Sequence, residues 1–312
     1  MVIDCQASIL LFFKTWAACA RRKKIRRAEG EVEAKNSCLG IANVCYTFNM
    51  KWATFLVLIA APAWAQFATE EMLKPYVYTN ETGETFAYRM SVPQFPEAGK
   101  KYPLILFLHG SGECGTDNEK QIKAGLPVLM SNLLKQPEKV IVVAPQCQNG
   151  NWWVGKLAFD PNYAAAREPS GSMEVALALC RNAVTSGLAD SNRLYVTGLS
   201  LGGFGTWDAI QREPTLFAAA VPICGGGDIR RVQPIKKLPI WVFHGRMDKN
   251  VPVDCSRRMV ESLKQAGNRS VQYTEYETGE HNVWDAAYAN PELLEWLLKQ
   301  TRVQAKPWWR FW

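Results

Sequence analysis

The chain has few histidines and no cluster of residues typical of a metal site. Only three of its 312 residues are histidine, and its nine cysteines form no CxxC pair and no Cys/His cluster. Structural zinc sites need such closely spaced ligands. We therefore expect no zinc site, and no metal or cofactor for whatever chemistry the protein performs.

Outside the start of the chain, basic and acidic residues nearly balance, so little net positive charge remains there. The net charge is +7, but residues 1–65 hold nine of the 36 basic and four of the 29 acidic residues, which leaves 27 basic and 25 acidic residues. No basic stripe remains that could follow a phosphate backbone. Nucleic acid is therefore excluded as the expected partner.

Long apolar runs are missing as well. The apolar run over residues 53–61 is far shorter than the ~20 residues that a membrane-spanning helix needs. It follows Lys51 and precedes Ala63 and Ala65, which flank Trp64 in an A-x-A cleavage pattern. We interpret residues 50–65 as a secretory signal peptide and expect a secreted or periplasmic protein with no stable membrane span.

Residues 1–49 precede this signal and contain the basic stretch RRKKIRR. A secretory signal is N-terminal, so we expect translation to start at Met50 and residues 1–49 to be an upstream extension outside the fold. The alternative is a basic anchor that touches a membrane. Residues 66–312 hold five cysteines, expected to be mostly buried thiols, with Cys114 and Cys147 the best pair if a disulfide forms.

Residues 66–312 alternate strand-like and helix-like segments without repeats or a long linker. Continuous apolar runs that end at turns are typical of strands covered on both faces. Separated by helices, they predict a single α/β domain with a mainly parallel, doubly wound sheet. The expected strands lie at 84–92, 102–110, 139–145, 193–198, 218–225, 238–245 and 271–276, and the expected helices at 173–188, 202–212 and 256–267.

Ser200 stands between two glycines, Gly198 and Gly202, in the stretch VTGLSLGGFG. It follows an apolar run and opens a small-residue helix, so it lies on a sharp strand-to-helix turn. Glycines at both second neighbours remove the Cβ atoms that would collide in such a turn. The motif alone is weak, but its position after a buried strand makes Ser200 a candidate nucleophile.

A serine nucleophile needs a base, and His281 is the best candidate because it lies in a polar loop after a strand. His109 and His244 each precede a glycine at the end of a buried strand, where a histidine more often hydrogen-bonds a turn. Asp248, at the carboxyl end of a strand, is the expected carboxylate, with Asp228 as the alternative.

Main-chain donors are expected for the negative charge that develops on an attacked carbonyl oxygen. The N–H of Leu201 follows the nucleophile at a helix N-terminus. The glycine-rich loop HGSGECG after the strand at 102–110 supplies the second donor, from Ser111 or else Gly112. The order Ser200, Asp248, His281 is the one expected of an α/β-hydrolase arrangement.

The chain resembles secreted α/β-hydrolases of the prolyl-oligopeptidase-like and dienelactone-hydrolase-like peptidases and esterases. These are similar to polyhydroxybutyrate depolymerase-type and feruloyl or acetylxylan esterases. The resemblance spans roughly residues 85–300 and departs in residues 1–49, in the cysteine of HGSGECG and in the tail KPWWRFW. It rests on the segments LILFLHGSGECGTDN, VTGLSLGGFGTWDA, VPICGGGD, FHGRMDKNVP and GEHNVWDAAY.

The resemblance implies an α/β-hydrolase fold with Ser200 as nucleophile, His281 as base, Asp248 as acid and oxyanion donors after His109. We expect an exported serine esterase, and Trp152, Trp153 and Trp284 are candidates to stack on a sugar or aromatic acyl group, as in a polysaccharide-linked ester. A peptidase with the same triad, or a non-catalytic carbohydrate-binding protein, are the alternatives. Acyl and alcohol specificity and oligomeric state stay open.

Overall fold

The computed structural model describes residues 66, 68–93, 96–155 and 163–302, all within one compact unit of the chain. The expected signal peptide at 50–65, the extension at 1–49 and the aromatic tail lie outside the described residues. No helix in the described part is long and apolar enough to cross a bilayer.

The described residues form an eight-stranded sheet in the order β1-β2-β4-β3-β5-β6-β7-β8. β2 pairs antiparallel with both β1 and β4, and all other neighbours are parallel. The α/β fold predicted from the sequence is thereby confirmed. The strands are β1 Lys74–Thr79, β2 Thr85–Ser91, β3 Tyr102–Leu108, β4 Ile141–Pro145, β5 Ala189–Leu199, β6 Ala219–Ile223, β7 Trp241–Gly245 and β8 Gln272–Tyr276.

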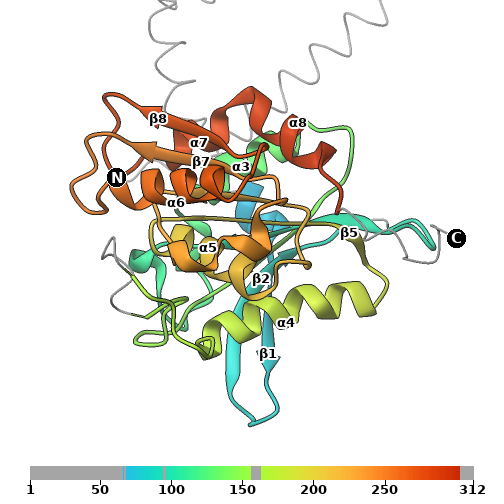
Figure 1. The fold of residues 1–312 in the computed structure, drawn as a ribbon. Coiled ribbons are helices and arrows are strands. Elements are labelled where there is room, and N and C mark those ends of the chain that lie inside the picture. The colour runs from blue at the N-terminus through green and yellow to red at the C-terminus, as the bar shows by residue number, and fades with distance from the viewer. Residues whose placement is uncertain (1–65, 67, 94–95, 156–162, 303–312) are drawn as a thin grey trace, which may run out of the picture. The chain divides into compact units, whose positions relative to one another are not determined.

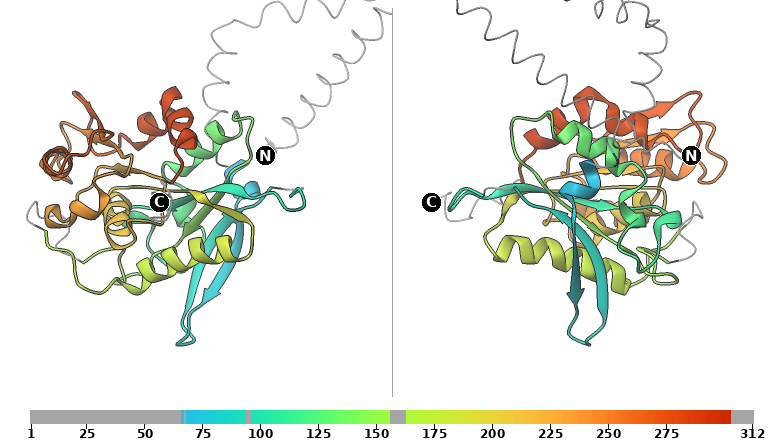
Figure 2. Two further views of the ribbon diagram at one scale, coloured as in Figure 1. Left: turned by 45° about the vertical axis from the view of Figure 1, so that its right-hand side comes forward. Right: turned by 180° about the vertical axis from the view of Figure 1, so that it is seen from behind.

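Burial of the strands follows their place in the sheet. Every residue of the central strands β3, β4, β6 and β7 is buried, as the continuous apolar runs predicted. β1 is mostly exposed and was not predicted, because its sequence KPYVYT begins with lysine and proline and has no core-facing run. In Figure 2 the β1–β2 hairpin, in blue and cyan, projects away from the helices.

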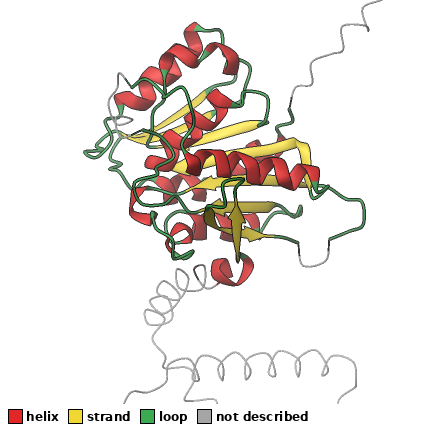
Figure 3. Cartoon of the chain, turned by 90° about the horizontal axis from the view of Figure 1, so that it is seen from below, coloured by secondary structure: helices red, strands yellow, loops and turns green. Residues whose placement is uncertain are grey.

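Helices cover both faces of the sheet (Figures 1 and 3). Residues of α4, α5 and α6 pack on one face with Leu104, Leu106 and Val196, and residues of α3, α7 and α8 pack on the other with Ile105 and Phe107. The α-helices are α3 Leu126–Leu133, α4 Gly171–Thr185, α5 Leu201–Arg212, α6 Asp254–Gln265, α7 Trp284–Ala289 and α8 Pro291–Lys299, and the short 3-10 helices are η1 Ser111–Glu113, η2 Lys120–Ile122, η4 Ile229–Arg231 and η5 Gln233–Ile235.

Three loops meet at the carboxyl ends of the parallel strands. β5 ends at Leu199 and α5 begins at Leu201, so Ser200 is the single residue between them. Asp248 follows the end of β7 by three residues, and His281 follows the end of β8 by five. Because parallel strands end at the same edge of the sheet, these segments are brought together there.

Candidate active site

Ser200 occupies a strained backbone conformation, with φ 54° and ψ −117°. Its N–H donates to the carbonyl of Ile223 at 2.9 Å, and its carbonyl accepts from Gly203 and Phe204 at the start of α5. A non-glycine residue at positive φ costs energy that surrounding structure must offset. The turn therefore holds the hydroxyl at the end of the strand in one fixed position.

The two flanking glycines are required by close backbone contacts. A Cβ atom on Gly198 would lie 2.3 Å from the carbonyl oxygen of Gly202, and one on Gly202 would lie 1.9 Å from that of Leu108. Neither contact can be relieved by a side-chain rotation, because both involve main-chain atoms. The GxSxG pattern is thus explained by the approach of α5 to strands β3 and β5.

Replacing Gly202 with alanine should destabilise the domain by on the order of 3 kcal/mol, because α5 must move away from β3. The same movement displaces Ser200, so ester hydrolysis should fall as well. Thermal unfolding and initial rates measure both effects. Gly155→Ala is the matched control, since a Cβ there meets nothing within 4 Å. Equal unfolding midpoints for the two variants would contradict the steric explanation.

The structure brings Ser200, His281 and Asp248 into one hydrogen-bonded chain. His281 Nε2 lies 2.9 Å from Ser200 Oγ, and His281 Nδ1 lies 2.6 Å from Asp248 Oδ2. Ser200 keeps 7% of its surface exposed, and the His281 side chain 17%. The imidazole therefore lies between the serine hydroxyl and a carboxylate, and the His281 side chain is partly exposed to solvent.

The Asp248 carboxylate is buried and held by several donors. Its Oδ1 accepts the N–H groups of Asn250 and Val251, both at 2.9 Å. Burial raises the pKa of Asp248, but the hydrogen bonds from His244, His281 and Val251 outweigh burial and hold this pKa below its usual range. Because the pKa of Asp248 is lower in the folded state than in the unfolded state, the ionised carboxylate stabilises the folded protein at any pH above its unfolded-state pKa. This contribution is lost as the pH falls toward the folded-state pKa. The carboxylate is thus an anion at neutral pH.

His244 contacts the same carboxylate, which the sequence did not predict. Its Nε2 lies 3.2 Å from Asp248 Oδ2 and 3.1 Å from the carbonyl of Val251, and its Nδ1 lies 2.7 Å from Ser256 Oγ. Both acceptors near Nε2 require that this nitrogen carries a hydrogen. His244 and His281 therefore hold the same oxygen of the Asp248 carboxylate. The spacing of four residues between His244 and Asp248 was the sequence signal for the first of these contacts.

The other candidates have structural contacts instead. His109 accepts from the Cys147 N–H at 2.9 Å through Nε2 and lies 2.6 Å from the Gly110 carbonyl through Nδ1; burial lowers its pKa to about 4, so it is neutral. Asp228 forms a two-point contact with Arg230 and accepts from the Ala165 N–H at 3.1 Å. His109 thus supports a turn, and Asp228 is not the partner of His281.

The expected oxyanion donors belong to the helix that follows Ser200 and to the loop that follows β3. Leu201 is the first residue of α5, where main-chain N–H groups have no partner within the helix. Ser111 and Gly112 are exposed residues of η1. A Cβ on the adjoining Gly110 would lie 3.6 Å from Ser200 Cβ, which places this loop directly beside the serine.

Glu113, in the same loop, was not singled out from the sequence. A Cβ on Gly110 would lie 3.0 Å from the Glu113 carboxylate, so the side chain folds back over Gly110. Burial raises the pKa of Glu113, while hydrogen bonds from the N–H groups of Gly110 and of Glu113 itself lower it in part. The Glu113 carboxylate therefore holds the main chain of the loop through these hydrogen bonds. Its position in the segment HGSGE was the one feature of the sequence that could have indicated this role.

Cys224 is a third neighbour of the triad residues that the sequence did not indicate. Its Sγ donates to the carbonyl of His281 at 3.3 Å, and it lies at positive φ at the end of β6. Ligand atoms of Cys224, Asp248 and His281 lie within 4.8 Å of one another. Burial raises the pKa of the Cys224 thiol and keeps it protonated, and the other two groups bond each other. We therefore assign no metal site to them.

The three tryptophans differ in their access to the site. Trp153 is completely buried and donates through Nε1 to the His109 carbonyl at 3.0 Å, so the prediction that it contacts substrate is wrong. Its apolar ring fills the core beneath the loop. Trp152 is half-buried against the core. The Trp284 ring stands edge-on to His281, with centroids 5.5 Å apart, and remains a candidate substrate contact.

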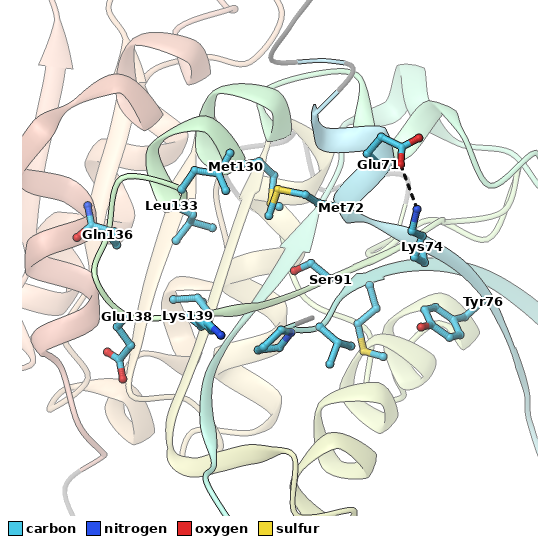
Figure 4. A pocket seen from close by; sticks show the side chains of 15 residues that line it. Glu71, Met72, Lys74, Tyr76, Ser91, Met130, Leu133, Gln136, Glu138 and Lys139 are labelled. Atoms are coloured by element: carbon cyan, nitrogen blue, oxygen red, sulfur yellow. Dashed lines mark hydrogen bonds and ion pairs between the residues drawn. The ribbon is translucent and has the colours of Figure 1, made fainter. Parts of the chain in front are cut away.

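A cavity of about 640 Å³ lies elsewhere in the molecule (Figure 4). Among its lining residues are Ser91, the last residue of β2, and Val140, which directly precedes β4. This places it at the amino end of β4, whereas the triad residues follow the carboxyl ends of their strands. The cavity therefore does not serve Ser200.

The sheet order and a serine on the turn between β5 and α5 define an α/β-hydrolase. The chain belongs to the phospholipase/carboxylesterase family, which it matches over residues 95–290. The comparison with curated proteins gave no match.

Solved structures share the fold. A thermostable esterase is 38% identical, with a TM-score of 0.67 over 74% of this chain and 64% of its own length, so the chain spans less than two thirds of that protein. An acylaminoacyl peptidase of Pyrococcus horikoshii is 14% identical (TM-score 0.55; 78% of this chain, 44% of that one). A ferulic acid esterase is 16% identical (TM-score 0.55; 73% and 98%). The two neighbours below 25% identity share the fold with this chain and no more.

Proposed function

We propose that the protein is a serine hydrolase that cleaves carboxylic esters through an acyl-enzyme. The observation that carries this proposal is the hydrogen-bonded chain from Ser200 Oγ through the His281 imidazole to the buried Asp248 carboxylate. A serine hydroxyl is a weak nucleophile unless a base takes its proton, and here the base is itself oriented by an anion. Family membership supports the same activity.

In the acylation step, Ser200 Oγ attacks the ester carbonyl carbon while its proton passes to His281 Nε2. The imidazole becomes charged, and the Asp248 carboxylate at Nδ1 stabilises that charge. The carbonyl oxygen becomes an oxyanion that accepts the N–H groups of Leu201 and of Ser111 or Gly112. When the tetrahedral intermediate collapses, the alcohol leaves with the proton from His281.

In the deacylation step, water takes the place of the alcohol. His281 Nε2 accepts a proton from this water, whose oxygen attacks the acyl carbon bound to Ser200. The same main-chain donors stabilise the second oxyanion. Collapse returns the proton to Ser200 Oγ and releases the carboxylic acid, which restores the free enzyme. Every proton is thus carried by one imidazole.

For the substrate class, we propose acyl esters carried by plant polysaccharide. We propose further that the enzyme is exported and reaches this substrate outside the cytoplasm. The Trp284 ring beside His281 supports an aromatic or sugar group at the site, because rings of this kind stack on planar apolar surfaces. The ferulic acid esterase among the structural neighbours fits this substrate class, although its similarity concerns the fold. The signal-like sequence at residues 50–65 supports the proposal of export.

The experiment compares acetyl, feruloyl and hydroxyalkanoate esters with the anilides of the same acids. We expect measurable kcat/KM for the esters, highest for the feruloyl ester, and no measurable cleavage of the anilides. Resonance stabilises an amide carbonyl more strongly than an ester carbonyl, so esters are the easier substrates for one triad. The esters and anilides must therefore be compared with the same acyl group. Anilide cleavage at a rate comparable with that of the ester would favour a peptidase. No turnover of either would favour a non-catalytic binding protein.

A further inference from the structure

The loop beside Ser200 is joined by hydrogen bonds to the segment that follows β4. The Cys147 N–H donates to His109 Nε2 at 2.9 Å, and the Gly115 N–H donates to the Cys147 carbonyl at 2.9 Å. Gln146 Nε2 donates to the Glu113 carbonyl at 3.1 Å. Both ends of the loop that carries the expected oxyanion donors are therefore fixed to residues 146 and 147.

Two cysteines face each other across this junction. Cys114 directly precedes Gly115, whose N–H bonds the carbonyl of Cys147, so the main chains of the two cysteines run side by side. The two thiols are close enough to interact, which lowers the pKa of Cys114, while the Cys147 Sγ donates its own hydrogen to the Asn151 carbonyl at 2.8 Å. Cys114 is 7% exposed and Cys147 is fully buried, and both are free thiols in the structure. A disulfide requires neighbouring main chains and thiols within reach of each other, and the hydrogen bond from Gly115 to Cys147 supplies the first of these conditions.

We propose that Cys114 and Cys147 are a redox pair that forms a disulfide bond, which ties the loop beside Ser200 to the end of β4. The main chains at the two positions are already joined by a hydrogen bond, so the disulfide forms by rotation of the two side chains, and the Cys147 thiol gives up its hydrogen bond to the Asn151 carbonyl. The disulfide therefore leaves the position of Ser111 and Gly112 unchanged and makes the loop harder to unfold. Ester hydrolysis is not needed for this inference, which stands on the two thiols and their contacts.

The chemistry balances with a small-molecule disulfide, such as oxidised glutathione, as the oxidant. Cys114 is the more exposed of the two cysteines, and its interaction with the Cys147 thiol lowers its pKa, which favours the reactive thiolate. Its sulfur attacks the oxidant, forms a mixed disulfide and releases one thiol. Cys147 then loses its proton and attacks the Cys114 sulfur, which closes the bond and releases the second thiol.

Peptide mapping tests the bond directly. Trypsin places Cys114 in the peptide at 102–120 and Cys147 in the peptide at 140–156, each with a single cysteine. The full chain is incubated with oxidised or reduced glutathione, alkylated and digested without reductant. We expect, after oxidation, a linked pair of these peptides two hydrogens lighter than their sum. Recovery of both peptides as separate alkylated or glutathionylated species would overturn the proposal.

Thermal unfolding tests the consequence. The bond closes a loop between residues 114 and 147, so oxidation should raise the unfolding midpoint of the wild type by roughly 5–10 °C. Cys114→Ser and Cys147→Ala should each abolish the response to oxidant. Cys180→Ala, at a buried cysteine of α4, is the matched control and should keep it. An unchanged midpoint on oxidation of the wild type, or an equal rise in the Cys114 variant, would also overturn the proposal.

Discussion

Replacing Ser200 with alanine should lower kcat/KM for p-nitrophenyl acetate by roughly 10⁴- to 10⁶-fold. The change removes the only atom that forms the acyl-enzyme, while the main-chain donors and the His281–Asp248 pair stay in place. Because alanine is smaller than serine and the turn is held by main-chain bonds, the fold should survive. Initial rates and the unfolding midpoint of the same preparations provide the measurement.

Ser262→Ala, on α6, is the control for the loss of a serine hydroxyl elsewhere, and it should keep full activity. A fluorophosphonate probe adds an independent readout, since it labels a serine only when a base activates that serine. Wild type and Ser262→Ala should be labelled, and Ser200→Ala should not. Substantial ester turnover by folded Ser200→Ala would refute the proposed nucleophile.

Replacing Asp248 with asparagine should lower kcat by about 10⁴-fold. The amide oxygen can still accept the N–H groups of Asn250 and Val251, so the loop should keep its shape. What is lost is the negative charge that fixes the hydrogen on His281 Nδ1 and stabilises the charged imidazole. The free-energy cost appears in the chemical step, so kcat should change far more than KM.

The matched control is Asp254→Asn, because Asp254 is an exposed carboxylate that pairs with Arg257 at the start of α6. Exposed pairs of this kind contribute little to stability, so this variant should resemble wild type. Far-ultraviolet circular dichroism of both variants checks the fold. If Asp248→Asn retained more than about one tenth of wild-type kcat, the proposed role of this carboxylate would have to be abandoned.

The sequence predicted the sheet well where burial is uniform and poorly at its edge. The central strands are continuous apolar runs because helices cover both of their faces, and such runs are readable without coordinates. β1 has no buried face and left no comparable pattern. For β1 the sequence missed an element, whereas for Trp153 it predicted a substrate contact that the structure does not have. Aromatic residues near a candidate site look the same in sequence whether they line the site or fill the core below it.

The sequence predicted Ser200, His281 and Asp248, the three residues that the structure brings together. A serine between glycines, a histidine in a polar loop and an aspartate at the end of a strand can each be recognised from their immediate sequence neighbours. The contacts that support them are not visible, because they join residues far apart in sequence. His244 bonds Asp248 from one side, Cys224 bonds the main chain of His281, and Glu113 folds over Gly110.

By itself, the sequence determined strands β2 to β8, helices α4, α5 and α6 and the turn at Ser200, because hydrophobic period and glycine placement act over a few residues. It missed β1 and the helices α3, α7 and α8. The tertiary structure alone decided which side chains meet. Parallel strands end at one edge, and so residues 81 apart, Ser200 and His281, come within a hydrogen bond. The same packing placed Cys114 against Cys147, since distance in space depends on how the sheet is assembled and not on spacing along the chain.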